Sequence, residues 1–168
     1  LNFLVCDNPI IPMGRENIFR SAIYMVLKGQ YYEAMHILAP QVENLFRNIA
    51  KEVGGLTITL DNDGASKEKV LKSIFDLPEL LDCYDNDILF LFKGLLNEQA
   101  GANIRNEIAH GITSEYMASS GAYLYFAGAV IKLLTYTSIK CYELITTEGS
   151  KLKTFIEPES DAIKIKRM

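Results

Sequence analysis

Three polar side chains of one short segment, Arg105, Asn106 and His110, are of types that suit phosphodiester chemistry. An arginine guanidinium is always charged and can hold two phosphate oxygens while charge builds in the transition state. An imidazole, with an ordinary pKa of about 6.5, can take a proton from a ribose 2′-hydroxyl or give one to the departing 5′-oxygen. An asparagine amide adds neutral groups that orient a substrate. The segment, flanked by Gly101 and Gly111, is therefore the candidate working site.

Helix geometry limits how Arg105 and His110 can act together. Residues five apart on a helix lie about 140° from one another, whereas Asn106 and His110, four apart, share a face. One continuous helix therefore does not easily aim the guanidinium and the imidazole at the same phosphate. Two arrangements remain open: the helix breaks at Gly111, or Arg105 and His110 from two subunits converge across a two-fold axis.

Each candidate residue also has a purely structural interpretation. Arg105, Asn106 and His110 would then form a polar cluster that satisfies backbone groups of a loop between two helices. Glu43 and Arg47, four apart on a predicted helix, would form a solvated ion pair worth roughly 0.2–0.5 kcal/mol. His36, on the same edge stripe of that helix as Pro40, Glu43 and Arg47, is most simply a histidine at the edge of the core.

Composition limits the class of protein. A chain of 168 residues predicts one domain with one core. Its net charge of −4, from 17 Lys plus Arg against 21 Asp plus Glu, counts against a protein that coats nucleic acid without specificity. Cys6, Cys83 and Cys141 are an odd number without a CxxC spacing, and two histidines are too few for a usual zinc cluster. We expect buried, reduced cysteines, a cytoplasmic setting, and neither a metal nor a cofactor.

Two further features of the sequence are its longest apolar segment and its first residue. The longest apolar run, Ala118 to Ile131, ends at Lys132 after about fourteen residues, and a membrane-spanning helix needs about twenty. We therefore expect a buried helix there and no membrane span. The chain begins at Leu1 instead of a methionine, so we expect it to be a piece of a longer protein.

Hydrophobic periodicity predicts an all-α helical bundle with one long C-terminal helix and a possible minor two-stranded β element. We expect an irregular lead-in over residues 1–13, a helical domain over 14–149 and a C-terminal tail over 150–168. The candidate strands are two short segments in which side chains of two kinds alternate with period two, Leu56–Leu60 and Ala162–Lys166. The predicted helices span residues 15–28, 31–53 with a kink at Pro40, 66–75 with Ser66 as cap, 85 or 86 to about 99, and 114 to about 147.

The last predicted helix is apolar nearly all round between Gly121 and Tyr136. A helix packed only against its own bundle needs one apolar face, so two faces predict a homodimer through the 114–147 helix. Small residues at Gly121, Gly128 and Ala129 would permit close approach. The alternative is a helix at the centre of the monomer, covered on both sides. The two faces are Met117, Gly121, Leu124, Gly128 and Ile131, and Ala122, Tyr125, Phe126, Ala129, Leu133 and Tyr136.

Two stretches of the chain resemble a known family. The Arg-x4-His spacing of Arg105 to His110 resembles that of the HEPN superfamily, helical-bundle domains many of which cut RNA. The residues from Arg105 through Gly111 are similar to the Arg-Asn-x-x-x-His-Gly signature of the DUF4209 family. Leu38 to Arg47 is similar to that family's Leu-x-Pro-Gln-x-Glu-Asn-x-x-Arg stretch.

This resemblance implies a dimeric bundle that cuts RNA without metal, leaving a 2′,3′-cyclic phosphate and a 5′-hydroxyl. Arg105 would hold the phosphate, His110 would do acid/base work and Asn106 would position the substrate, with Glu43 and Arg47 supporting them. We therefore expect a metal-independent endoribonuclease. Because the superfamily includes members that only bind or dimerise, the alternative is a non-catalytic module that dimerises or binds a nucleotide or protein partner and regulates a larger protein. A metal-dependent hydrolase is the third interpretation.

Overall fold

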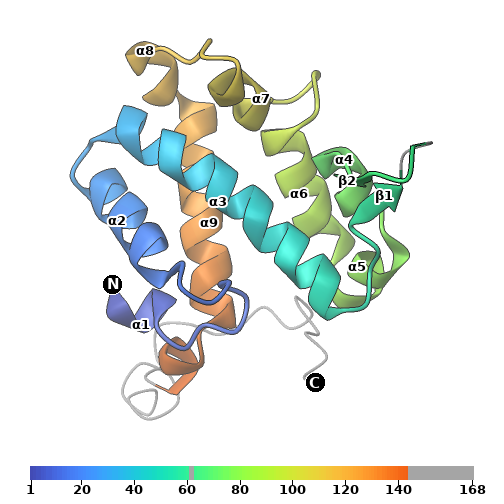
Figure 1. The fold of residues 1–168 in the computed structure, drawn as a ribbon. Helices are drawn as coiled ribbons and strands as arrows, with labels where there is room; N and C mark the ends of the chain where they lie inside the picture. Colours follow the sequence, from blue (N-terminus) through green and yellow to red (C-terminus); the bar gives the residue numbers. More distant parts are fainter. Residues whose placement is uncertain (61–62, 144–168) are drawn as a thin grey trace.

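Helices make up most of the chain in the computed structural model, which describes residues 1–60 and 63–143 (Figure 1). A two-stranded antiparallel sheet, β1 (Ile58–Leu60) with β2 (Ser66–Glu68), is the only sheet among these residues. The predicted all-α bundle with a minor β element is therefore confirmed. The helices are α1 (Asn2–Val5), α2 (Glu16–Leu27), α3 (Tyr31–Glu52), α4 (Leu71–Phe75), α5 (Pro78–Cys83), α6 (Asn86–Leu96), α7 (Ile104–Ala109), α8 (Glu115–Ala118) and α9 (Gly121–Thr137).

The bundle is arranged around α3, which contacts α2, α4, α5, α7, α8 and α9 (Figure 1). Its apolar residues recur at spacings of three and four, so they form one continuous buried face. Pro40 lies inside this helix, as predicted, and has no N–H to donate to the carbonyl of His36 one turn earlier. The buried face consists of Ala34, Met35, Leu38, Ala39, Val42, Leu45, Phe46, Ile49 and Ala50.

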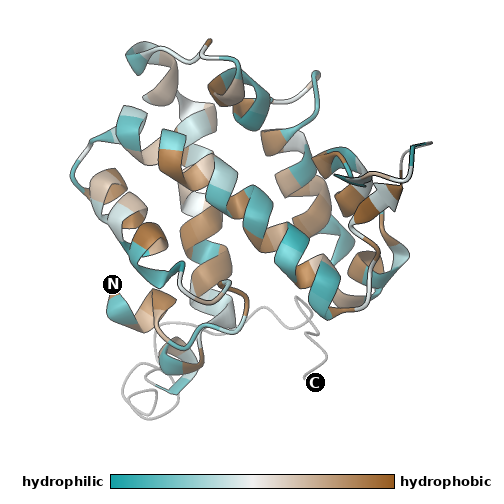
Figure 2. Cartoon of the chain, in the orientation of Figure 1, coloured by the Kyte–Doolittle hydropathy of each residue, from teal (hydrophilic) through white to brown (hydrophobic). Residues whose placement is uncertain are grey.

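Aromatic side chains join α3 to α4, α6 and α9. The ring of Phe46 lies 4.9 Å from that of Phe75 and 5.1 Å from that of Phe92, and Phe92 meets Phe126 edge-on at 6.4 Å. Such pairs add about 0.5–1.5 kcal/mol each beyond the burial of their area. The cluster connects α3, α4, α6 and α9, and Figure 2 shows α6 and the lower part of α9 as largely hydrophobic. It fixes the end of α6 from which the chain turns into α7.

The N-terminal segment, predicted as an irregular lead-in, belongs to the core. It forms the short helix α1, which contacts α2 and α9, and it buries Leu4, Val5, Ile10 and Ile11. The side-chain amide of the buried Asn8 donates to the carbonyls of Leu4 (2.8 Å) and Leu134 (3.0 Å). A four-residue helix is too short to show periodicity, which is why the sequence pattern did not reveal it.

A β-hairpin replaces the start of the helix predicted over residues 66–75. Ile58 pairs with Glu68 and Leu60 with Ser66, so Ser66 lies in a strand and caps no helix; α4 begins only at Leu71. Between the two strands lies Gly64, whose φ of 76° is a conformation that other residues avoid. β1 confirms the first predicted strand, while the predicted partner, 162–166, and the tail over 150–168 lie outside the described residues.

The helix predicted from residue 114 to about 147 is divided. Ser114 caps α8 by accepting a hydrogen bond from the N–H of Met117 (3.2 Å), as expected, but α8 ends at Ala118. The Ser119 hydroxyl donates to the carbonyl of Glu115 (2.8 Å), and Ser120 is extended before α9 begins. Serine hydroxyls compete for backbone groups in this way and interrupt helices. α9 ends at Thr137, and residues beyond 143 are outside the described part.

One face of α9 is buried and the opposite face is exposed. The side chains of Leu124, Tyr125 and Tyr136 are 39%, 59% and 57% exposed, and Gly121 and Gly128 have open space beside them. The alternative of a monomer required α9 to be covered on both sides. The described residues cover it on one side only. The buried residues of α9 are Tyr123, Phe126, Ala127, Val130, Leu133 and Leu134.

The turn that leads into α7 depends on a close backbone contact. A Cβ at Gly101 would lie 2.1 Å from the carbonyl oxygen of Gly94, whereas a Cβ at Gly94 would meet nothing within 4 Å. We expect Gly101→Ala to lower the free energy of unfolding by about 1–3 kcal/mol. Gly94→Ala, the matched control within helix α6, should be neutral or stabilising by up to about 1 kcal/mol. Chemical denaturation measures both; equal effects would show that α6 and the turn do not touch.

Candidate functional site

The start of α7 is set by a left-handed residue and a buried anchor. Asn103, directly before the helix, has φ 49°, a conformation that asparagine adopts more readily than most residues. Its side-chain oxygen accepts a hydrogen bond from the Asn106 amide (2.7 Å). Ile104 is fully buried, so the first turn of α7 is held against the bundle. This turn presents Arg105 and Asn106 beside α3.

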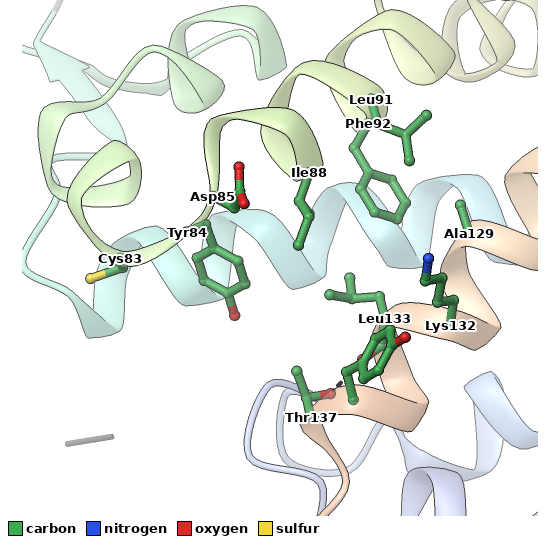
Figure 3. Close-up of a pocket in the computed structure, with 11 residues that line it drawn as sticks. Cys83, Tyr84, Asp85, Ile88, Leu91, Phe92, Ala129, Lys132, Leu133 and Thr137 are labelled. Atoms are coloured by element: carbon green, nitrogen blue, oxygen red, sulfur yellow. Dashed lines mark hydrogen bonds between the residues drawn. The ribbon is translucent and has the colours of Figure 1, made fainter. Parts of the chain in front are cut away.

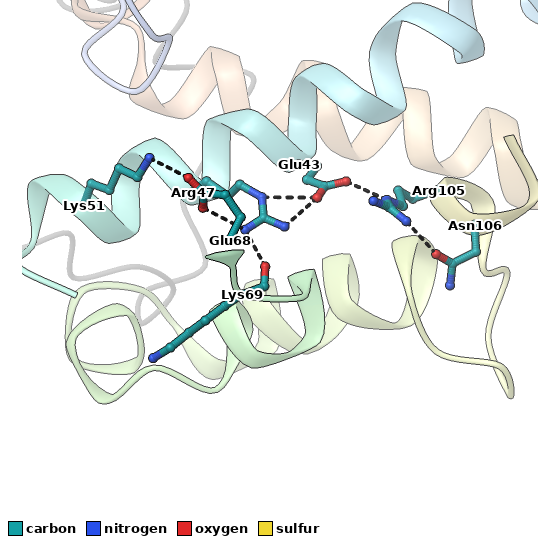
Figure 4. A network of polar contacts seen from close by, with 7 residues as sticks. All are labelled: Glu43, Arg47, Lys51, Glu68, Lys69, Arg105 and Asn106. Atoms are coloured by element: carbon teal, nitrogen blue, oxygen red, sulfur yellow. Dashed lines mark hydrogen bonds and ion pairs between the residues drawn. The ribbon is translucent and has the colours of Figure 1, made fainter. Parts of the chain in front are cut away.

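Glu43 of α3 lies between two arginines (Figure 4). One carboxylate oxygen accepts a hydrogen bond from Arg105 Nε at 2.6 Å. The other accepts from Arg47 Nη2 at 2.7 Å and Nε at 3.1 Å. Arg105 Nη1 also donates to the Asn106 side-chain oxygen at 3.0 Å. Four residues predicted from the sequence, Glu43, Arg47, Arg105 and Asn106, thus form one connected network.

The hairpin extends this network. Arg47 Nη1 donates to the carbonyl oxygen of Lys69 at 2.6 Å and lies 3.5 Å from Glu68, which also pairs with Lys51 at 3.4 Å. The side chains of Glu43 and Arg47 are only 13% and 15% exposed, so their pair is not the solvated one considered above. The sequence did not indicate Lys51, Glu68 and Lys69, because residues 66–68 were predicted to begin a helix instead of a strand.

The charges of this network are unevenly balanced. Burial acts to raise the pKa of Glu43, but hydrogen bonds and charges from Arg105 and Arg47 outweigh burial, so the pKa falls below its ordinary value of 4.5. Three cationic and two anionic side chains give the network a formal charge of +1, within a chain of net charge −4. The cations are Arg47, Lys51 and Arg105, the anions are Glu43 and Glu68, and Lys69 takes part only through its backbone carbonyl oxygen.

Arg105 keeps the capacity to bind an anion. A guanidinium has five N–H donors, and within the described residues Arg105 uses one on Glu43 and one on Asn106. Its side chain is 36% exposed, whereas that of Glu43 is 13% exposed. The inner edge of the guanidinium is therefore held by the protein while other donors remain available to a phosphate.

His110 lies apart from this network. It follows the last residue of α7, and the helix ends before Gly111, which has φ 68°. The helix is closed by backbone bonds from Gly111 N–H to Ile108 and from Ile112 N–H to Glu107. The imidazole is exposed, and no hydrogen bond joins it to Arg105 or to another described residue. The structure brings Arg105 and Asn106 together but leaves His110 at the surface beside them.

A buried tyrosine holds both flanks of the His110 loop. The Tyr123 hydroxyl, on α9, donates to Glu107 (3.0 Å) and lies 3.0 Å from the Thr113 hydroxyl. Burial raises the pKa of Tyr123; the hydrogen bond with Thr113 opposes that rise and Glu107 adds to it. These residues are three before and three after His110, so the loop is tied to α9 at both ends. No sequence motif indicated this contact.

His36 lies at the surface of α3. Its Nδ1 is 2.7 Å from the carbonyl oxygen of Tyr32, and the two rings are 4.2 Å apart. The imidazole is partly exposed, and the described residues offer no partner to Nε2. Its intermediate burial, beside the buried Met35 and Leu38, agrees with a position at the edge of the core.

A pocket occurs between the α5–α6 turn and the C-terminal half of α9 (Figure 3). Its lining is mostly apolar and includes Ile88, Leu91, Phe92 and Leu133. At its edge, burial and the neighbouring Cys83 raise the pKa of Tyr84 to about 12. No residue of the Arg105–Gly111 segment lines this pocket. The candidate site is an open surface that lies elsewhere on the bundle.

Three other properties belong to residues 1–60 and 63–143. No helix in these ranges is both long and apolar enough to cross a membrane. No three His, Cys, Asp or Glu side chains there are grouped to hold a metal ion. Cys141 is buried, Cys6 and Cys83 are partly exposed, and all three are free thiols.

No protein-family model, curated protein or solved structure matches the chain. The resemblance to the HEPN superfamily therefore rests on Arg105–Gly111 and Leu38–Arg47, the two stretches that the network joins through Glu43 and Arg105. The ribonuclease activity that it implies stays a prediction.

We expect Glu43→Gln to destabilise the protein at neutral pH. The change leaves the guanidiniums of Arg47 and Arg105 without their shared counter-charge, and it should lower the free energy of unfolding by about 2 kcal/mol. Because folding lowers the pKa of Glu43, its stabilisation is present above the ordinary value of 4.5 and is lost as the pH falls through the folded-state value. The difference between wild type and variant should therefore shrink in acid.

Urea denaturation at neutral and acidic pH measures this difference. Glu33→Gln is the matched control, since Glu33 is an exposed glutamate on the same helix. Its effect should stay within about 0.5 kcal/mol at either pH. A Glu43→Gln effect no larger than the control, or one that does not change with pH, would contradict the role of Glu43 in holding the two arginines.

Proposed function

We propose that the protein is a metal-independent endoribonuclease in which Arg105 binds the scissile phosphate and His110 transfers protons. One observation supports this most: the Arg105 guanidinium is held by Glu43 and Asn106, yet it keeps free donors and is 36% exposed. The exposed imidazole of His110 follows five residues later, at the end of the same short helix. The three free cysteines fit the proposed cytoplasmic setting.

The proposed reaction is an attack of the ribose 2′-hydroxyl on the adjacent phosphorus. A P–O2′ bond forms and the P–O5′ bond breaks, which leaves a 2′,3′-cyclic phosphate and a 5′-hydroxyl. Arg105 stabilises the charge that builds on the non-bridging oxygens, and Asn106 orients the substrate. His110 takes part in the transfer of the proton from the 2′-oxygen to the 5′-oxygen.

Glu43 contributes by fixing the direction of Arg105. A long arginine side chain loses rotamer freedom when it is ordered, and binding is weaker if the substrate has to order it. The 2.6 Å bond to Glu43 orders the guanidinium before a phosphate arrives. Arg47 in turn holds Glu43 through two hydrogen bonds. Glu43 and Arg47 thus act on the substrate only through Arg105.

The surroundings of the site suit a polymer better than a small molecule. The network carries a local charge of +1, so this surface attracts phosphates although the chain as a whole is acidic. The pocket of Figure 3, which could enclose a small ligand, is lined by other residues. An open cationic surface fits a single RNA strand that passes over α7.

A homodimer through α9 is part of the proposal. The exposed face of this helix carries Leu124, Tyr125 and Tyr136, and open space beside Gly121 and Gly128 permits close approach of a second helix. α9 starts next to the loop that carries His110, to which Tyr123 ties it. A second copy packed near the start of α9 would bring a second Arg105–His110 segment to the same end of the assembly.

One observation favours a non-catalytic module as the alternative function. Arg105, Asn106 and Glu43 bind one another, so the network also has a structural role in joining α7 to α3. A module of this kind would dimerise or bind a nucleotide or protein partner and regulate a larger protein. It would leave RNA intact.

We expect the wild-type protein to cleave a short single-stranded RNA in excess chelator and to leave 2′,3′-cyclic phosphate ends. Arg105→Ala and His110→Ala should each lower the rate by about 100-fold or more. Lys140→Ala also removes one charge, but beyond the C-terminal end of α9, and should keep the wild-type rate. Product ends are identified by mass spectrometry. Intact RNA with the wild-type protein would favour the module, and loss of cutting on addition of chelator would favour a metal-dependent hydrolase.

We expect sedimentation to show a dimer that Tyr125→Glu converts to a monomer. A carboxylate placed on the exposed apolar face of α9 would be desolvated at the interface, which strongly opposes association. Phe90→Glu is the control, because Phe90 is 77% exposed on α6. A Tyr125→Glu variant that remains dimeric would place the interface elsewhere.

A further inference from the structure

The proposed cleavage needs two proton transfers, one from the 2′-hydroxyl and one to the 5′-oxygen. The chain contains two histidines, His110 and His36. His36 has so far no part in the reaction, although its side chain is partly exposed and lies on the helix that carries Glu43.

His36 and Glu43 lie at nearly the same angular position on α3. A separation of seven residues brings the helix back to within about 20° and advances it about 10 Å along the axis. Glu43 points toward α7, because it binds Arg105. His36 therefore lies on the same side of α3, two turns nearer its N-terminus.

The path of the chain after Arg105 leads toward this end of α3. From the contact between Arg105 and Glu43, α7 runs toward the N-terminal half of α3, and α8 then follows above that half (Figure 1). Both α7 and α8 contact α3. His110 lies in the connection between α7 and α8, so the fold brings it to the end of α3 that carries His36.

The contacts of His36 settle which nitrogen can accept a proton. A carbonyl oxygen only accepts hydrogen bonds, so the 2.7 Å contact with Tyr32 requires that Nδ1 carries the hydrogen. In the neutral ring the lone pair then lies on Nε2, which has no partner among the described residues. Contact with the Tyr32 ring, at 4.2 Å, restricts the orientation of the imidazole. His36 thus presents one oriented, unpartnered acceptor nitrogen, which a general base requires.

We propose that His36 is a second catalytic residue, the general base of the RNA cleavage proposed above, and that His110 is the general acid. His36 Nε2 takes the proton of the 2′-hydroxyl as the P–O2′ bond forms. The His110 imidazolium gives its proton to the 5′-oxygen as the P–O5′ bond breaks. His36 ends protonated and His110 neutral, and exchange with solvent restores both. This inference rests on the proposed function.

The pH dependence of cleavage tests this assignment. A general base has to be deprotonated and a general acid protonated, so the rate should rise and then fall with pH. Apart from the residues of the site, the other charged or titratable groups on the elements that meet here are carboxyl, phenol and ammonium groups, and none is an imidazole. They are Lys28 after α2, Tyr31, Tyr32 and Glu33 on α3, Glu107 on α7, and Glu115 and Tyr116 on α8.

We expect His36→Asn to lower the rate of RNA cleavage at least about 100-fold and to remove the rise of the rate at low pH. The asparagine amide can still donate to the Tyr32 carbonyl, so the variant removes the base while it keeps the local contact. His110→Asn should instead remove the fall at high pH. Glu33→Gln, one turn before His36 on the same helix, should keep the wild-type profile.

The outcomes separate the two proposals. The role of His36 would be overturned if His36→Asn cleaved RNA with the pH profile of the wild type and at a rate within threefold of the wild-type rate. A threefold change in rate corresponds to about 0.65 kcal/mol. The proposal of a ribonuclease would then still stand. No cleavage by the wild-type protein would overturn both.

A second measurement does not depend on catalysis. In the NMR spectrum the two histidines give two sets of imidazole signals, which His36→Asn assigns. Titration with a 2′-deoxy dinucleotide, which cannot be cut by this route, should shift the signals of both rings. A shift of the His110 signals alone would overturn the role of His36.

Discussion

The carboxylate of Glu43 is the contact on which the rest of the site depends. It joins three parts of the molecule that are distant in the sequence: α3, on which it lies, α7 through Arg105, and the hairpin through Arg47 and the Lys69 carbonyl. A carboxylate that is 13% exposed would be costly to bury alone. Two guanidiniums offset that cost, because each donates charged hydrogen bonds to it. Each arginine binds a different oxygen of this carboxylate, so Glu43 helps to fix the direction of both.

The same arrangement explains how an acidic chain can offer a cationic surface. One negative charge orients two positive ones, so the guanidinium pair keeps a net positive charge after Glu43 has been counted. The difference in exposure then decides which arginine meets the solvent: Arg47 is 15% exposed, whereas Arg105 is 36% exposed. Arg47 serves to hold the carboxylate, and Arg105 keeps donors for a ligand. An Arg105 paired with a fully exposed glutamate would be neutralised by a mobile partner and would lack this orientation.

The fold and half of the site could be predicted from the sequence because they follow from local patterns. The bounds of α2, α3 and α6 follow from apolar residues at helical spacing, and Glu43, Arg47, Arg105 and Asn106 are named by their motifs. The errors arose where contacts distant in sequence decided the structure. Ser66–Glu68 forms a strand because the turn before it returns it to β1, although Ser66 alone resembles a helix cap. The contact of Tyr123 with Glu107 and Thr113 joins two helices and has no motif.

The division of the helix at Ser119 and Ser120 does have a local signal, two serines before a glycine, which the strong apolar pattern obscured.

Helix α3 acts as the rigid support along which the candidate groups are arranged. Arg47, Glu43 and His36 occur on one stripe, and the rise of 1.5 Å per residue separates the first from the last by about 16 Å. Groups on a helix hold their spacing better than groups on loops, and the buried face of α3 makes this helix the most firmly packed element of the bundle. Pro40 lies on the same stripe and leaves the His36 carbonyl without its helical partner. The ladder of backbone hydrogen bonds is thus interrupted between His36 and Glu43, while the helix continues from Tyr31 to Glu52 and keeps both residues on one stripe.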